Sequence, residues 1–159
     1  YTHVEPGLIR VNAEEVTYPL HEILRYELER DLILGGVEVK DIPARGDAAM
    51  KDYLNLDTAG NYRDGPMQDG HWPSASIGYF PSYTLGAMTA AQLHHAMVQA
   101  IPDAPAMISR LELQPVFDWL SEMIWQKGRL LDYDELMTEA TGEKLNPDHF
   151  LNHLRSRYL

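Results

Sequence analysis

Residues 12–36 read NAEEVTYPLHEILRYELERDLILGG, and this stretch decides the fold class. Its aliphatic side chains recur at steps of three and four residues, which is the period of an α-helix with one apolar face. Asn12 and Glu15 have the spacing of a capping box, and the closing glycine pair is a typical helix end. Because Pro19 lacks a backbone N–H, we expect either a kink or a regular helix that begins near the proline.

Shorter helical segments fill the rest of the chain. Apolar periodicity and flanking proline or glycine residues predict helices at about 43–54, 83–100, 113–127, 133–141 and 147–158. Residues 56–79 have almost no periodicity and many turn-forming residues, so we expect an ordered loop there. No segment of useful length has the two-residue period of a strand. The sequence therefore predicts an all-α, multi-helix fold with one long ordered loop, forming a single domain over residues 1–159.

The composition limits the possible partners. The chain has 159 residues, of which 45% are hydrophobic, and this is enough for one sizeable core. The chain has 13 Lys and Arg residues and 24 Asp and Glu residues, and the resulting net charge of -11 repels nucleic acid. No apolar run approaches the roughly 20 residues of a membrane helix, and no signal peptide is visible after Tyr1. The absence of cysteine excludes thiolate metal sites and suits a reducing compartment. We expect a cytoplasmic protein that binds neither nucleic acid nor membranes.

The segment from Gly65 to Gly86 is the candidate working surface. It reads GPMQDGHWPSASIGYFPSYTLG and holds large polar and aromatic side chains in a backbone shaped by Gly and Pro. Binding and catalytic loops have this composition, whereas a simple connection is short and freely polar. The side chains with useful chemistry are Gln68, Asp69, His71, Trp72, Tyr79 and Tyr83.

A structural explanation of these residues stays open. Gln68, Asp69 and His71 could satisfy backbone groups of the loop, while Trp72 anchors the loop to the core. The tyrosines beside the next helix start could equally be core residues. Arg10 stands in an apolar stretch just before the first helix, where a buried arginine needs an anionic partner. That partner could be a carboxylate of this chain or the carboxylate of a bound substrate.

The histidine spacings do not predict a metal site. His21-Glu22 begins like the zincin motif HExxH, but Arg25 stands where the second histidine should be. His149 and His153 lie one helical turn apart without an evident third ligand, so a solvated helix face is the simpler explanation. We therefore expect no metal ligand in this chain.

Three stretches of the chain contain long motifs in a fixed order. Residues 5–21, EPGLIRVNAEEVTYPLH, are similar to the signature (I/V)RxxAD and its surroundings. Residues 65–72 match GxxQDxHW at every defined position, and residues 78–86 resemble GYFPTYTLG with Ser82 in place of threonine. Together with a similar C-terminal end, these motifs resemble the carboxypeptidase Taq family of zinc metallocarboxypeptidases over essentially the whole chain.

The chain also departs from the family pattern. Glu14 stands where the signature has Asp, which lengthens the reach of the carboxylate, and Gly46 stands where many relatives have tryptophan. Members of the family are much longer, and their HExxH helix and glutamate ligand lie upstream of the matching region. The resemblance therefore implies the C-terminal part of a helical, zincin-like metallocarboxypeptidase whose zinc-binding half is not in this sequence.

The resemblance implies an activity and a set of site residues. In that family zinc or cobalt and the HExxH glutamate activate a water that releases C-terminal amino acids from peptides. His71, Tyr79 and Tyr83 are then the catalytic candidates, as donors to the oxyanion. Arg10 is the candidate for binding the substrate's terminal carboxylate, because its planar fork fits a carboxylate. The other substrate-binding candidates are Gln68, Asp69 and Trp72; Asp69 could also fix the tautomer of the histidine.

The same resemblance implies that this chain alone is inactive and binds no metal by itself. Its expected partners are the C-terminus of a peptide substrate, the missing N-terminal catalytic part, and further copies in a homo-oligomer such as a dimer. The alternative is a non-catalytic module, derived from the family, that binds peptides or only dimerises. A proteolytic remnant without a separate function is a third explanation.

Overall fold

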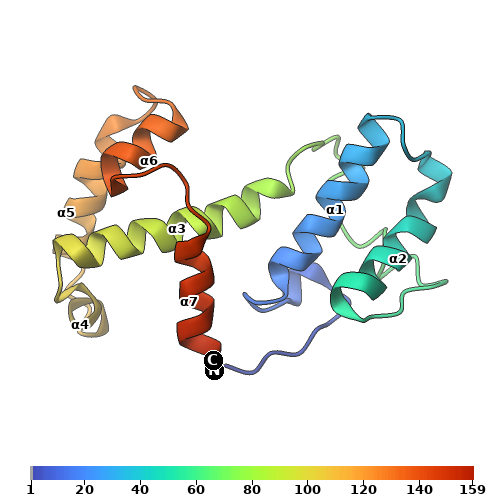
Figure 1. Ribbon diagram of the computed structural model, residues 1–159, viewed down its shortest axis with the longest axis horizontal. Helices are drawn as coiled ribbons and strands as arrows, with labels where there is room; N and C mark the ends of the chain where they lie inside the picture. The colour runs from blue at the N-terminus through green and yellow to red at the C-terminus, as the bar shows by residue number, and fades with distance from the viewer. Residues whose placement is uncertain (1) are drawn as a thin grey trace. The chain divides into compact units, whose positions relative to one another are not determined.

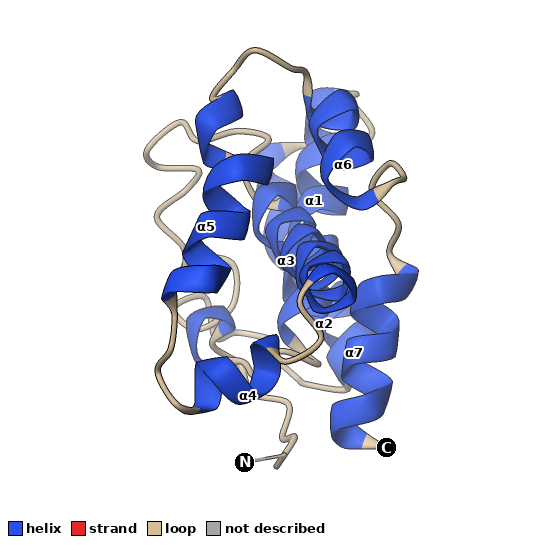
Figure 2. Cartoon of the chain, turned by 90° about the vertical axis from the view of Figure 1, so that its left-hand side faces the viewer, coloured by secondary structure: helices blue, strands red, loops and turns tan. Residues whose placement is uncertain are grey.

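The computed structural model describes residues 2–159, which fold into helices joined by turns and loops (Figures 1 and 2). Within this range no strand occurs, so the all-α prediction is confirmed. None of the described helices is long and apolar enough to cross a membrane. The α-helices are α1 (Tyr18–Ile33), α2 (Ile42–Leu54), α3 (Pro81–Ala100), α4 (Ala104–Ser109), α5 (Gln114–Met123), α6 (Tyr133–Thr141) and α7 (Asp148–Tyr158). Short 3-10 helices are η1 (Arg10–Asn12), η2 (Val39–Asp41) and η3 (Trp125–Lys127).

The chain divides into two compact units, one up to Leu85 and one from Gly86 onward. In the first unit α1 packs alongside α2 (Figure 1). The buried apolar cluster between them consists of Leu24, Leu28, Met50 and Leu54. The second unit has its own cluster, formed by Met97, Ala104, Val116 and Trp119. The single domain expected over residues 1–159 stays a prediction.

Helix α1 begins later than the capping-box pattern suggested. Asn12 lies in η1, and the regular helix begins at Tyr18 with Pro19 in its first turn, where a missing N–H is harmless. The carboxylate of Glu14 accepts hydrogen bonds from the backbone N–H groups of Val16 and Thr17 at 2.7 and 3.0 Å. The longer side chain at position 14 therefore places a negative charge just before the helix, where the helix dipole favours it.

Two other boundaries differ from the predicted ones. The helix expected over 113–127 ends at Met123, and the remainder forms η3. Helix α4 was not predicted from the sequence. In the structure Pro105 lies in the first turn of α4, a position that tolerates proline.

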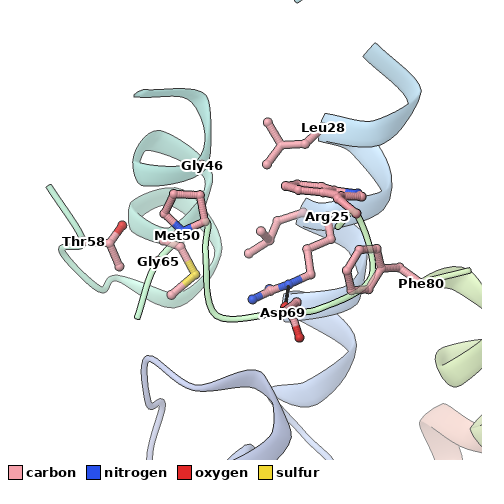
Figure 3. A pocket seen from close by; sticks show the side chains of 11 residues that line it. Arg25, Leu28, Gly46, Met50, Thr58, Gly65, Asp69 and Phe80 are labelled. Atoms are coloured by element: carbon pink, nitrogen blue, oxygen red, sulfur yellow. Dashed lines mark hydrogen bonds and ion pairs between the residues drawn. The ribbon is translucent and has the colours of Figure 1, made fainter. Parts of the chain in front are cut away.

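A small cavity lies between α1, α2 and the loop over residues 55–80 (Figure 3). Arg25 and Leu28 line it from α1, Gly46 and Met50 from α2, and Asp69 from the loop. Its volume of about 20 Å³ has room for about one water molecule. A Cβ atom added at Gly46 would lie 3.8 Å from Leu28 Cδ1, which is an ordinary van der Waals contact.

We predict that Gly46→Ala stabilises the protein. Alanine costs less backbone entropy than glycine in a helix interior, and its methyl group meets no close contact here. The free energy of unfolding in urea should rise by about 1 kcal/mol.

Gly65→Ala is the matched control, since a Cβ there would lie only 2.8 Å from the carbonyl oxygen of Asn61. This second change should lower the free energy of unfolding. A loss of stability with Gly46→Ala would show that the space beside Leu28 is not available.

Candidate functional site

Asp69 lies at the centre of a buried charge cluster in the first unit. Arg10 Nε donates a hydrogen bond to Asp69 Oδ1 at 2.9 Å, and Arg10 Nη2 lies 2.9 Å from the same oxygen. Arg25 Nε donates to the other oxygen, Oδ2, at 2.5 Å, which is the dashed contact in Figure 3. The three side chains are only 5%, 6% and 11% exposed for Arg10, Arg25 and Asp69. A loop residue is therefore fixed from η1 and α1 at once.

Another nitrogen of Arg10, Nη1, is also engaged. Its Nη1 donates to Tyr18 Oη at 2.6 Å and to Glu22 Oε1 at 3.1 Å. The guanidinium carbon lies 5.1 Å from the ring centroid of Tyr83 and 5.8 Å from that of Phe80, within the range of cation–π attraction.

Of the two anionic partners considered for Arg10, the structure shows carboxylates of this chain, those of Asp69 and Glu22. A direct contact with a substrate carboxylate stays a prediction. It would require Arg10 to release an internal partner.

The cluster changes the acidity of its carboxyl groups. Burial raises the pKa of Asp69, but the neighbouring guanidinium groups of Arg25 and Arg10 outweigh burial and hold this pKa below its ordinary value. For Glu22 burial outweighs the attraction of Arg10, and its pKa is raised. Asp69 is therefore the firmly ionised member of the cluster, and both arginines are held by its charge.

Two further motif residues hold the loop in place. Gln68 accepts a hydrogen bond from the backbone N–H of Arg10 at 2.8 Å and donates to the carbonyl of Leu8 at 3.0 Å. Trp72 Nε1 donates to Glu29 Oε1 on α1 at 3.0 Å. Gln68, Asp69 and Trp72 thus bind other parts of the same unit, which agrees with the anchoring explanation for these side chains.

His71 has a different environment, at the edge of an open pocket of about 360 Å³. Its Nε2 lies 2.8 Å from Tyr83 Oη, and its ring centroid lies 4.3 Å from that of Phe80. Tyr79 is 51% exposed and packs edge-on against Tyr83 with ring centroids 5.3 Å apart. The pocket is lined by Gly70, His71, Ser74, Ser76, Tyr79 and Tyr83. All three predicted catalytic side chains therefore meet at one pocket.

The predicted contact between Asp69 and His71 is long. His71 Nδ1 lies 4.0 Å from Asp69 Oδ1, which exceeds hydrogen-bond distance. The same oxygen of Asp69 contacts Arg10 at 2.9 Å and is the one nearer to His71. The role of Asp69 in fixing the tautomer stays a prediction.

Comparison with known proteins identifies the family. The carboxypeptidase Taq (M32) metallopeptidase family matches residues 1–158. The chain belongs to this family. The resemblance to this family is thereby confirmed.

Several M32 relatives match almost all of this chain. Carboxypeptidase 1 of Bacillus subtilis is 39% identical over 154 residues, 97% of this chain and 30% of its own length. Thermostable carboxypeptidase 1 of Pyrococcus furiosus is 35% identical over 156 residues, 98% of this chain and 31% of its own length. The solved structure of Trypanosoma cruzi metallocarboxypeptidase 1 matches 99% of this chain with a TM-score of 0.95 and 45% sequence identity. The matching part is 32% of the Trypanosoma cruzi chain. This chain thus spans about a third of the length of its M32 relatives.

Sequence reasoning missed three members of the charge cluster. Tyr18, Glu22 and Arg25 follow one another on α1 at steps of four and three residues, and Glu29 continues the same stripe. This spacing was a usable signal, but a polar stripe on a helix normally faces solvent. In this M32 chain Glu22, Arg25 and Glu29 are buried. Their partners come from the loop far along the sequence, and so the helix pattern alone does not reveal them.

The described residues do not fit a metal ion. Between residues 2 and 159 no group of three or more His, Asp or Glu side chains is arranged to bind one. His21, the first residue of the incomplete zincin motif, is fully buried, and its Nε2 lies 3.1 Å from the carbonyl of Gly7. Its Nδ1 lies 3.4 Å from Arg25 Nη1. The histidine contributes to packing of the M32 chain beside the charge cluster.

We predict that His21 makes stability depend on pH. Burial, with a further contribution from Arg25, lowers its pKa from 6.5 to about 4. The unfolded chain therefore takes up this proton first, and stability present above about pH 6.5 is lost as the pH falls towards about 4. Urea unfolding across this range should show a steeper loss for the wild type than for His21→Gln, whose amide can still donate to Gly7. If the free energy of unfolding falls equally steeply with pH in the wild type and in His21→Gln, His21 is not the source of the pH dependence.

Proposed function

We propose that this chain supplies the substrate-binding part of a metal-dependent carboxypeptidase. The enzyme would hydrolyse the last peptide bond of a peptide and release C-terminal amino acids. The observation that carries the proposal is the hydrogen-bonded pair of His71 and Tyr83 at an open pocket, in a chain that belongs to the M32 metallopeptidases.

The pocket suits the hydrolysis of an amide. Attack on a carbonyl carbon gives a tetrahedral intermediate whose oxyanion needs donors held in a fixed position. Tyr83 and His71 are restrained by their mutual hydrogen bond and by ring contacts with Phe80 and Tyr79. Because their positions are set before substrate arrives, little reorganisation is required when the charge develops.

Activation of water has to come from outside this sequence. The family name specifies a metallopeptidase, and we propose zinc or cobalt as its metal. The HExxH motif is incomplete here because position 25 is arginine. The described residues offer no metal site in its place. The chain by itself should therefore be catalytically silent and should act together with an N-terminal catalytic part.

Arg10 supports binding through the loop in this account. Its guanidinium holds Asp69, and its backbone N–H holds Gln68. Direct capture of the substrate's terminal carboxylate would leave a buried charge of this chain unpaired, and breaking such a pair costs roughly 3–5 kcal/mol. We propose the indirect role as the primary one. We also propose, from the family likeness, a cytoplasmic homo-oligomer.

The proposal predicts no hydrolysis by the isolated chain. An N-blocked dipeptide incubated with the purified 159-residue protein and excess zinc or cobalt should release no amino acid above a metal-only blank. Metal-dependent release that is abolished by Tyr83→Phe would show that the chain is a complete enzyme and would contradict the proposal.

Calorimetry separates the proposal from the non-catalytic alternative. A peptide with a free C-terminus and its amidated twin are titrated into the protein alone and into the protein mixed with the N-terminal part of an M32 relative. Hydrolysis restored by that part supports the enzyme role. Tight binding of either peptide with no restored hydrolysis favours a peptide-binding module.

A further inference from the structure

We infer that Tyr83 presents the proton to the pocket, and that His71 positions Tyr83 by donating to it from Nε2. This inference rests on the proposed function for the meaning of the pocket, but its structural content does not depend on activity. It assigns His71 as a positioning residue and Tyr83 as the group that touches the developing oxyanion.

The direction of the hydrogen bond follows from the other ring nitrogen. A neutral imidazole has one N–H and one lone pair, so the role of Nε2 is set by the state of Nδ1. His71 Nδ1 is buried and has no hydrogen-bond partner among the described residues. A proton on Nδ1 would be a buried donor without an acceptor, and in the protein backbone such orphaned N–H groups are rarer than under-satisfied carbonyl oxygens. The proton is therefore assigned to Nε2.

Asp69 is the nearest acceptor to Nδ1, and its facing oxygen is already occupied. Two nitrogens of Arg10 lie 2.9 Å from Asp69 Oδ1, whereas His71 Nδ1 lies 4.0 Å away. Oδ1 thus already accepts a hydrogen bond from Arg10, and at 4.0 Å it lies beyond hydrogen-bond distance of His71 Nδ1. Arg25 adds a second positive charge on Oδ2. The two arginines thus remove the attraction that would otherwise draw a proton onto Nδ1.

The consequence concerns the hydroxyl of Tyr83. With the proton on Nε2, the hydroxyl oxygen accepts from His71 at 2.8 Å, and its own O–H is free to point into the pocket. With the opposite tautomer the hydroxyl of Tyr83 would donate its hydrogen bond to Nε2 and could not donate to a substrate. Accepting a hydrogen bond also polarises the phenol and strengthens the bond that it donates. Arg10, Arg25 and Asp69 then influence the pocket donor through His71.

The tautomer can be measured directly by nitrogen-15 NMR. The intact chain, labelled at its seven histidines, is studied under alkaline conditions where imidazole is neutral, and the His71→Gln spectrum identifies the signals of His71. We expect a pyrrole-type shift for Nε2 and a pyridine-type shift for Nδ1. The reversed pattern, or shifts averaged between the two, overturns the inference.

Tyr83→Phe and Tyr79→Phe form a matched pair for the role of the hydroxyl. Both remove a hydroxyl from a ring that contacts His71, but the hydrogen bond is made by Tyr83. Loss of the acceptor in Tyr83→Phe should move the two nitrogen shifts of His71 towards each other, and Tyr79→Phe should leave them at wild-type values. Equal effects of the two changes, or no effect of Tyr83→Phe, contradict the role of Tyr83. Neither outcome depends on whether the chain serves a peptidase.

Discussion

The ion pairs of Asp69 with Arg10 and Arg25 are the constraint on which the site depends. The two arginines come from η1 and α1, and Asp69 comes from a loop that follows α2. All three side chains are nearly buried, so each charge is held by the others and not by water. A buried ion pair of this kind contributes little net stability compared with an apolar contact, but the loss of one member is costly. In this structure the pair connects the loop to η1 and α1.

The loop motif divides into residues that face the protein and residues that face the pocket. Gln68, Asp69 and Trp72 bind η1 and α1, whereas His71 contacts Tyr83 at the pocket edge. Neighbouring side chains in a turn-rich loop point in different directions. The four residues within these five positions therefore have different contacts. The contacts of Gln68, Asp69 and Trp72 hold the loop, and His71 is further restrained by its hydrogen bond to Tyr83. Such preorganisation is what stabilisation of an oxyanion requires.

The sequence predicted the helical class, the long ordered loop and the residues that gather at the pocket, because periodicity and motif density are local properties. Of the two alternatives for Pro19, the structure shows the regular helix that begins beside the proline, at Tyr18. The capping pattern of Asn12 and Glu15 does not mark the start of this helix, and Glu14 provides the contact that the structure shows. It left the partner of Arg10 open, and it missed Arg25. The partner of a buried charge depends on which segments meet in space, and no local pattern encodes that. The loop and α1 are separated by more than forty residues at their Arg25–Asp69 contact.

The coupling between Arg25 and Asp69 tests the central claim most directly. A double-mutant cycle with Arg25→Met and Asp69→Asn, measured by urea unfolding, should give a coupling energy of about 1.5–3 kcal/mol. A parallel cycle on the exposed Arg110–Glu112 pair should give a much smaller value, because that pair is largely solvated. If the effects at positions 25 and 69 add within about 0.5 kcal/mol, the charge cluster does not hold the loop, and the account is wrong.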